Sequence, residues 1–311
     1  MKNIIILLAL VLTIVSCSQK QNPQKDSEEV TMLKEKIAKF VPVEIQYDES
    51  LLTDREKVVL EKLYRASKII DELFLEQVYI ENDQIKSDLI SKINNKSILE
   101  NEPELKPQLE LFNIMFGPFD RLEDNKPFIG KNTKPLGANF YPADMSKEEF
   151  ERWIKDNPKD EKAFTSEFTI IRREDDKLIA IPYSEFFKDK LTAASNLLKE
   201  AAEYSDNPSL KKYLNSRADA FLSNDYYRSD MDWMDVKNNN IEVVIGPYEV
   251  YEDELFNYKA SFESFVTIKD PVESKKLEVF AKYLNDMEKN LPLDDKHKNF
   301  SRGSESPIVV A

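Results

Sequence analysis

Apolar residues recur every three or four positions over much of the chain, and this spacing predicts α-helices. The clearest helix begins at Thr53-Asp54-Arg55-Glu56, a capping box in which Thr53 can accept a backbone N–H while Glu56 reaches back. The residues on its buried face are Val59, Leu63, Ala66, Ile70 and Leu73. Further helices are predicted from Ser146, from Phe187 to Ala201, from Pro208 and from Pro271, the last with Leu277, Phe280, Leu284 and Met287 on one face.

Few segments have the pattern of strands. Residues 167–173 and 177–182 flank Glu174-Asp175-Asp176, which indicates a hairpin. Residues 241–245 and 262–268 are two further candidates. Since 41% of the 311 residues are hydrophobic, the chain can bury a sizeable core. The sequence therefore predicts a mainly α protein with a small β-sheet, of the α+β class.

The first residues have the pattern of an export signal. Lys2 precedes an apolar run at residues 4–15, which is too short to cross a bilayer as a helix. The run ends in Ile14-Val15-Ser16-Cys17, which resembles a bacterial lipobox. We therefore predict a lipoprotein signal peptide at residues 1–16, lipidation of Cys17 and a flexible tether at residues 17–30. The protein would then lie in the cell envelope, anchored by lipid to the outer membrane or to the periplasmic face of a membrane. The alternative is an ordinary secretory signal that happens to contain a cysteine.

The residue counts exclude several kinds of site and partner. A net charge of -14 repels phosphate backbones, so nucleic acid is not an expected partner; the charge also suits a well-solvated surface. Cys17 is the only cysteine, which excludes an internal disulfide. His297, the only histidine, lies in a polar run and is expected to be a solvated loop residue. One histidine cannot form an HExxH pair, so no metal ligands are assigned.

The stretch IGPYEVYEDELFNYKASFESF, residues 245–265, crowds aromatic and acidic residues beside a Gly-Pro turn. Glu249 and Tyr251 are two positions apart, so in extended backbone their side chains would point to one side. Gly246 would let the backbone approach a neighbour closely. A shorter echo, FGPFDRLED, occupies residues 116–124. Two interpretations stay open: a functional site, or a buried tyrosine hydrogen-bonded at a strand end.

Residues 246–266 resemble a segment of the dipeptidyl-peptidase III family of zinc metallopeptidases. The shared form is Gly-aromatic-Glu-x-Tyr-x-Asp, a spacer, and Phe-Glu-x-Phe. Three more segments resemble the family in the same order, at residues 116–130, 136–153 and 301–308. The resemblance implies a two-lobed protein that removes dipeptides from peptide N-termini. Residues 31–311 would be its N-terminal part, truncated before the helix that binds zinc.

The same resemblance implies roles for two residues. Tyr251 would be catalytic, donating a hydrogen bond to the developing oxyanion, and Glu249 would bind the amino end of a peptide substrate. Zinc is the implied cofactor, but its ligands are not in this sequence, so the chain alone is expected to be inactive. A partner chain carrying the zinc site could complete it. Whether the chain serves an enzyme stays open, since a non-catalytic peptide-binding surface lipoprotein or a pseudoenzyme would use the same residues.

Overall fold

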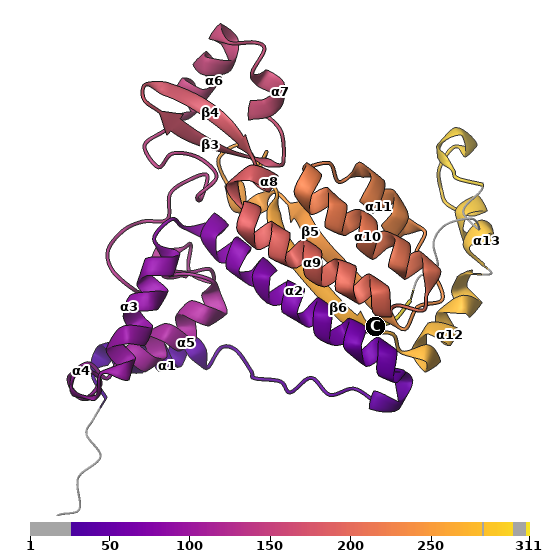
Figure 1. Cartoon of the computed structure of the whole chain (residues 1–311), viewed down its shortest axis with the longest axis horizontal. Coiled ribbons are helices and arrows are strands. Elements are labelled where there is room, and N and C mark those ends of the chain that lie inside the picture. The colour runs from indigo at the N-terminus through magenta and orange to yellow at the C-terminus, as the bar shows by residue number, and fades with distance from the viewer. Residues whose placement is uncertain (1–25, 282, 301–308) are drawn as a thin grey trace, which may run out of the picture.

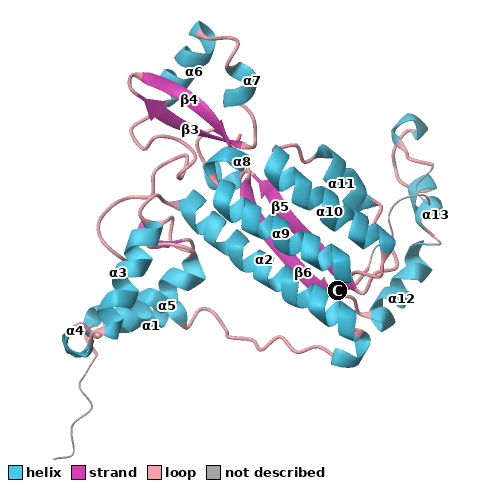
Figure 2. Ribbon diagram, in the orientation of Figure 1, coloured by secondary structure: helices cyan, strands magenta, loops and turns pink. Residues whose placement is uncertain are grey.

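The computed structural model describes residues 26–281, 283–300 and 309–311. Helices dominate it, as predicted, and the strands form small antiparallel pairs (Figure 2). The predictions for the signal peptide, Cys17 and most of the tether lie outside the described residues, as does the segment 301–308. Among the described residues, no helix is both long and apolar enough to cross a membrane.

The α-helices are α1 (Glu28–Ile37), α2 (Asp54–Val78), α3 (Asn82–Asn94), α4 (Lys96–Asn101), α5 (Leu105–Met115), α6 (Lys147–Asp156), α7 (Glu161–Phe164), α8 (Tyr183–Phe186), α9 (Lys188–Tyr204), α10 (Pro208–Ser223), α11 (Tyr227–Met234), α12 (Pro271–Ala281) and α13 (Leu284–Lys289). The 3₁₀ helices are η1 (Glu49–Leu51), η2 (Tyr251–Asp253) and η3 (Asp295–His297). The strands are β1 (Phe119–Asp120), β2 (Lys126–Pro127), β3 (Thr169–Glu174), β4 (Lys177–Pro182), β5 (Ile241–Glu249) and β6 (Ser261–Ile268).

The main core forms where α2, α9 and α10 pack beside the β5–β6 pair (Figure 1). The predicted buried face of α2 is confirmed, because its five residues are each at most 1% exposed. The capping box is present as well: the Thr53 N–H donates to Glu56 Oε2 at 2.8 Å, and the Glu56 N–H donates to Thr53 Oγ1 at 3.2 Å. Since α2 packs against β6, the strand pair has a firm support along one side.

A second core lies in a helical module built from α1, α3, α4 and α5 (Figure 1). Helix α1 begins at Glu28, so it already includes residues 28–30 of the predicted tether. Ser27 caps this helix by accepting the Val30 N–H at 3.2 Å, and Val30 and Leu33 are buried. Burial of these two side chains explains why the helix starts earlier than the polar composition of the segment indicated.

Two other predictions need correction. The helix predicted from Pro271 is divided into α12 and α13, and its supposed buried residues Phe280 and Met287 are 62% and 57% exposed. Leu277 and Leu284 on the same face are half-buried, so other elements cover the face only in part. The strand predicted at 241–245 continues through the Gly-Pro turn to Glu249. The β3–β4 hairpin is confirmed, and His297 is exposed as expected, although within η3.

Candidate active-site wall

A β-bulge at the end of β5 sets the geometry of the candidate site. Gly246 pairs with Glu263 and Pro247 with Phe262, but the next pair joins Glu249 to Ser261, so Tyr248 is the extra residue. Bulges of this kind redirect side chains near functional sites. The strand ends at Glu249, and η2 begins two residues later. The expected extended path from Glu249 to Tyr251 is therefore wrong, because the intervening residue Val250 has φ −100° and ψ −3°.

Gly246 allows a close approach between β5 and a buried arginine. Its φ is +152°, and a Cβ added there would lie 2.6 Å from Nη1 of Arg217. Arg217 is fully buried and pairs with Asp230 through a contact of 2.5 Å. Its guanidinium lies 5.4–5.6 Å from the ring centroids of Tyr213, Tyr226 and Tyr248. The expectation of a close backbone approach at this glycine is thus confirmed.

The two tyrosines beside the bulge have different environments. Tyr248 is half-buried, and its hydroxyl donates to the Ile245 carbonyl at 3.5 Å, so it matches the interpretation of a structural tyrosine at a strand end. Tyr251 is 64% exposed at the start of η2. An exposed phenol on a fixed turn can reach a ligand, whereas Tyr248 supports the strand beneath it.

Three ionisable groups influence one another at this place. Burial raises the pKa of Tyr251, and the negative charges of Glu263 and Glu249 raise it further. Burial also raises the pKa of Glu263, with the charge of Glu249 adding to the effect. Tyr251 therefore keeps its O–H at neutral pH and can donate a hydrogen bond. Two carboxylates that repel each other form a favourable place for an ammonium group.

Glu263 was not singled out by sequence reasoning, although it is the glutamate of the Phe-Glu-x-Phe element. The available signal was its position on the strand that pairs with β5, directly opposite Gly246. The two strand segments were predicted separately, without a pairing between them, so the register that brings Glu263 near Glu249 could not be assigned.

The acidic residues after Tyr251 have structural roles, beginning with Glu252. Its carboxylate is 1% exposed and accepts from Arg121 Nη1 at 2.7 Å and Nη2 at 3.2 Å. Lys134 lies 2.9 Å from the same carboxylate. Because Arg121 belongs to the FGPFDRLED segment, the two Gly-Pro segments are joined directly. The FGPFDRLED segment therefore anchors the turn that presents Tyr251.

Asp253 fixes the other side of this turn. It is fully buried and accepts a hydrogen bond from the Tyr141 hydroxyl at 2.8 Å. The backbone N–H groups that donate to its carboxylate are those of Leu255, Phe256, Tyr258 and Lys259. The crowding of carboxylates in this stretch thus has two causes: Glu252 and Asp253 build the turn, while Glu249 remains exposed beside Tyr251.

A zinc centre does not fit the residues that the structure describes. No group of three or more His, Cys, Asp or Glu side chains among them is arranged to hold a metal ion. Glu249, Tyr251 and Glu263, called the candidate wall below, supply a phenol and two carboxylates, without the nitrogen or sulfur ligands that zinc usually takes.

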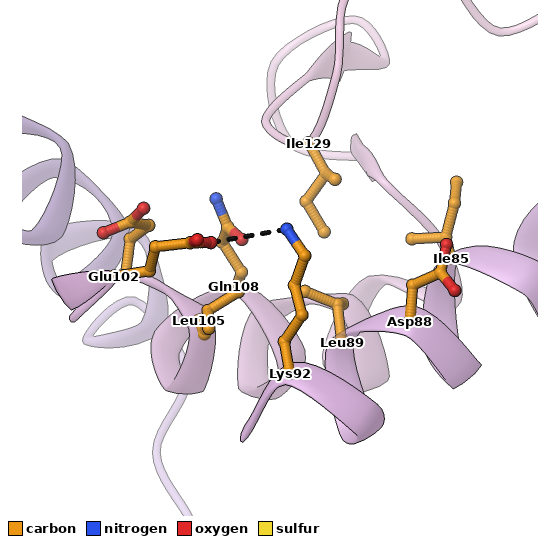
Figure 3. Close-up of a pocket in the computed structure, with 9 residues that line it drawn as sticks. Ile85, Asp88, Leu89, Lys92, Glu102, Leu105, Gln108 and Ile129 are labelled. Carbon is orange, nitrogen blue, oxygen red and sulfur yellow. Dashed lines mark hydrogen bonds and ion pairs between the residues drawn. The ribbon is translucent and has the colours of Figure 1, made fainter. Parts of the chain in front are cut away.

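A separate hollow of about 370 Å³ lies in the helical module (Figure 3). Ile85, Leu89, Leu105 and Ile129 give it apolar walls. Among its lining residues, the Lys92 ammonium donates to the Glu102 carboxylate at 3.3 Å. None of its lining residues belongs to the group around Tyr251, so it is not part of that wall.

The family model and two solved structures indicate the same family. The family model described as Peptidase family M49 matches residues 123–302. A solved structure of DPP III from Caldithrix abyssi is 62% identical, with a TM-score of 0.81, covering 89% of this chain and 51% of that one. Dipeptidyl-peptidase III from Corallococcus sp. strain EGB is 41% identical, with a TM-score of 0.77, covering 87% and 49%. Nudix hydrolase 3 of Arabidopsis thaliana is 33% identical over 328 residues, covering 89% of this chain and 42% of that protein. The chain thus spans about half the length of these relatives.

Proposed function

The chain belongs to peptidase family M49, a family of zinc metallopeptidases, and we propose that it forms the substrate-binding wall of a dipeptidyl peptidase. The observation that supports this most is the exposed Tyr251 phenol, whose pKa is raised by burial and by the charges of Glu263 and Glu249, on a turn with a buried ionic support. Such a rigid turn suits a group that must meet a reacting atom within a fraction of an ångström.

The carboxylates would bind the substrate's N-terminal ammonium. Glu249 is exposed and Glu263 is half-buried, so an ammonium between them would relieve their mutual repulsion and form charge-assisted hydrogen bonds. This contact would fix the distance between the free amino end and the peptide bond that is cleaved, as release of a dipeptide requires. An acetylated N-terminus would lose the positive charge and bind weakly.

Tyr251 would act on the scissile peptide. Its O–H is retained at neutral pH and can donate to the oxygen that becomes negative as the carbonyl is attacked. Because the described residues do not fit a zinc centre, attack on the carbonyl would depend on groups outside them. We accordingly expect the chain alone to release no dipeptide, and we propose that a further segment or partner chain supplies the metal site.

We also propose that the protein is anchored in the cell envelope through a lipid on Cys17. The supporting observation is the lipobox-like Ile14-Val15-Ser16-Cys17 after a short apolar run. Peptides in the envelope would then be the substrates that reach the wall.

A chimera tests the proposed reaction. This chain would be fused to the half of the Caldithrix abyssi DPP III that lies outside the alignment, and dipeptide release from a dipeptidyl arylamide would be followed. Tyr251→Phe should lower kcat about 10²-fold with little change in KM, as expected for loss of one oxyanion donor. Glu249→Gln and Glu263→Gln should mainly raise KM.

Tyr64→Phe is the matched control, because Tyr64 is 63% exposed on α2 and outside the wall. It should leave both constants unchanged. A Tyr251→Phe chimera with the kcat of the parent would remove the catalytic role from Tyr251.

A further inference from the structure

Residues 41–47, called the strap below, connect the helical module to the start of α2 as an extended segment (Figure 1). Its apolar side chains occupy alternate positions: Val41, Val43 and Ile45 are 81%, 77% and 91% exposed, and Tyr47 is 42% exposed. Alternation with a period of two is the pattern of a strand with one apolar face. Here that face is turned to solvent.

The backbone of the strap has no hydrogen-bond partner among the described residues either. Within the described residues, none of its N–H or C=O groups takes part in a hydrogen bond. Extended backbone with free donors and acceptors is able to add a strand from another segment. The exposed apolar side chains at alternate positions of the strap would make the contacts that fix the register of that pairing.

Hydrogen bonds connect the start of α2, which follows the strap in sequence, with the last described residues. Glu56, at the start of α2, accepts from the Asn240 side chain at 2.9 Å, and the Asn240 carbonyl accepts from the Lys269 N–H at 2.9 Å. The next residue, Asp270, donates its N–H to the Val310 carbonyl at 2.8 Å. The last described residues therefore lie at the same end of the molecule as the start of α2, the helix to which the strap leads.

We propose that the strap is a β-strand that pairs with one strand from the part of the M49 fold that lies outside the matched half. The matched half has a TM-score of 0.81 to the relative, whose chain is about twice as long, so the relative holds further structure beyond this half. A second copy of this chain is a poorer occupant. Two copies would bring together net charges of -14 and the exposed Glu44 of each strap.

This proposal rests on the proposed function in one respect: the partner strand is taken from the rest of the peptidase fold. Its test therefore uses binding and exchange instead of activity. Amide hydrogen exchange of residues 41–47 would be compared between the full chain alone and its chimera with the half of the Caldithrix abyssi DPP III that lies outside the alignment, called the outer half below. We expect exchange in the strap to slow at least about tenfold in the chimera.

Variants show whether strand pairing causes that protection. Val43→Pro removes one N–H donor, and Ile45→Asp places a charge on the apolar face; each should abolish the protection of the strap. Gln46→Asp changes the charge of the same segment on the opposite face and should leave the protection in place. Co-expression of the full chain with the outer half as a separate polypeptide should yield a complex that purifies together.

Three results would overturn the proposal. A strap that exchanges equally fast in the chain and in the chimera is not paired. Failure of the co-expressed halves to associate means that the strap does not bind that half. A strap protected in the chain alone, together with a dimer in solution, assigns the surface to a second copy of this chain.

Discussion

Replacing Asp253 should destabilise the protein strongly. Its buried carboxylate accepts from the Tyr141 hydroxyl and from four backbone N–H groups. A hydrogen bond to a charged group contributes about 1.5–3 kcal/mol, and each buried donor left without an acceptor costs about 1–3 kcal/mol. Water can reach part of the loop, because Tyr258 is 36% exposed, so these costs will not add fully. We expect Asp253→Ala to lower the free energy of unfolding by about 4 kcal/mol.

Urea denaturation followed by tryptophan fluorescence and far-UV circular dichroism measures this loss. Glu254→Gln is the control, since Glu254 is exposed and its pair with Lys134 spans 3.3 Å. Lys134 keeps its ion pair with Glu252 in this variant, so the loss should stay below about 1 kcal/mol. A loss below about 1 kcal/mol for Asp253→Ala would refute the idea that this carboxylate holds the turn that presents Tyr251.

Three further predictions concern other parts of the chain. Gly246→Ala should lower the free energy of unfolding, measured by thermal unfolding, by about 3 kcal/mol, because the new Cβ would meet the buried Arg217. The control Gly130→Ala, with no atom within 4 Å of its Cβ, should lower it by about 1 kcal/mol. Equal losses for the two variants would argue against the close approach at Gly246. Burial lowers the pKa of Lys259 from 10.5 to about 7. Between these pH values the unfolded chain binds a proton that the folded chain lacks, so the free energy of unfolding should rise with pH in this range. If a Lys259→Met protein shows the same rise, the rise has a source other than Lys259. Cys17→Ala should move the protein from the membrane fraction to the soluble fraction while Ser18→Ala should not, and a Cys17→Ala protein that stays with the membrane would exclude the lipid anchor.

Local signals predicted the parts of the fold that depend on neighbours in sequence. The capping box at Thr53 could be predicted from two residues three positions apart, and the buried face of α2 from the helical period. The β3–β4 hairpin could be predicted from its turn. The segment after Pro271 had the same period but became two helices with exposed apolar side chains. Periodicity shows which face could be buried, but the covering element must come from elsewhere.

The candidate wall was predictable only in part. Glu249 and Tyr251 were identified from a short motif, and their proximity survives although the backbone between them is not extended. The contact of Arg121 with Glu252 joins residues that are 131 positions apart, and no local pattern indicates it. Arg217 beneath Gly246 is a similar case, because only the packed structure shows why a side chain cannot fit there.

Binding of a peptide amino end tests the central proposal most directly. An NMR titration of the ¹⁵N-labelled chain would follow the Tyr251 amide while a tripeptide with a free N-terminus, or its N-acetylated form, is added at low salt. The free amine should bind at least about tenfold more tightly, as expected for a charge-assisted contact, and the difference should vanish in the Glu249→Gln, Glu263→Gln double variant. Equal affinity for the two peptides, or shifts confined to residues away from Tyr251, would contradict the assignment of this wall to substrate binding.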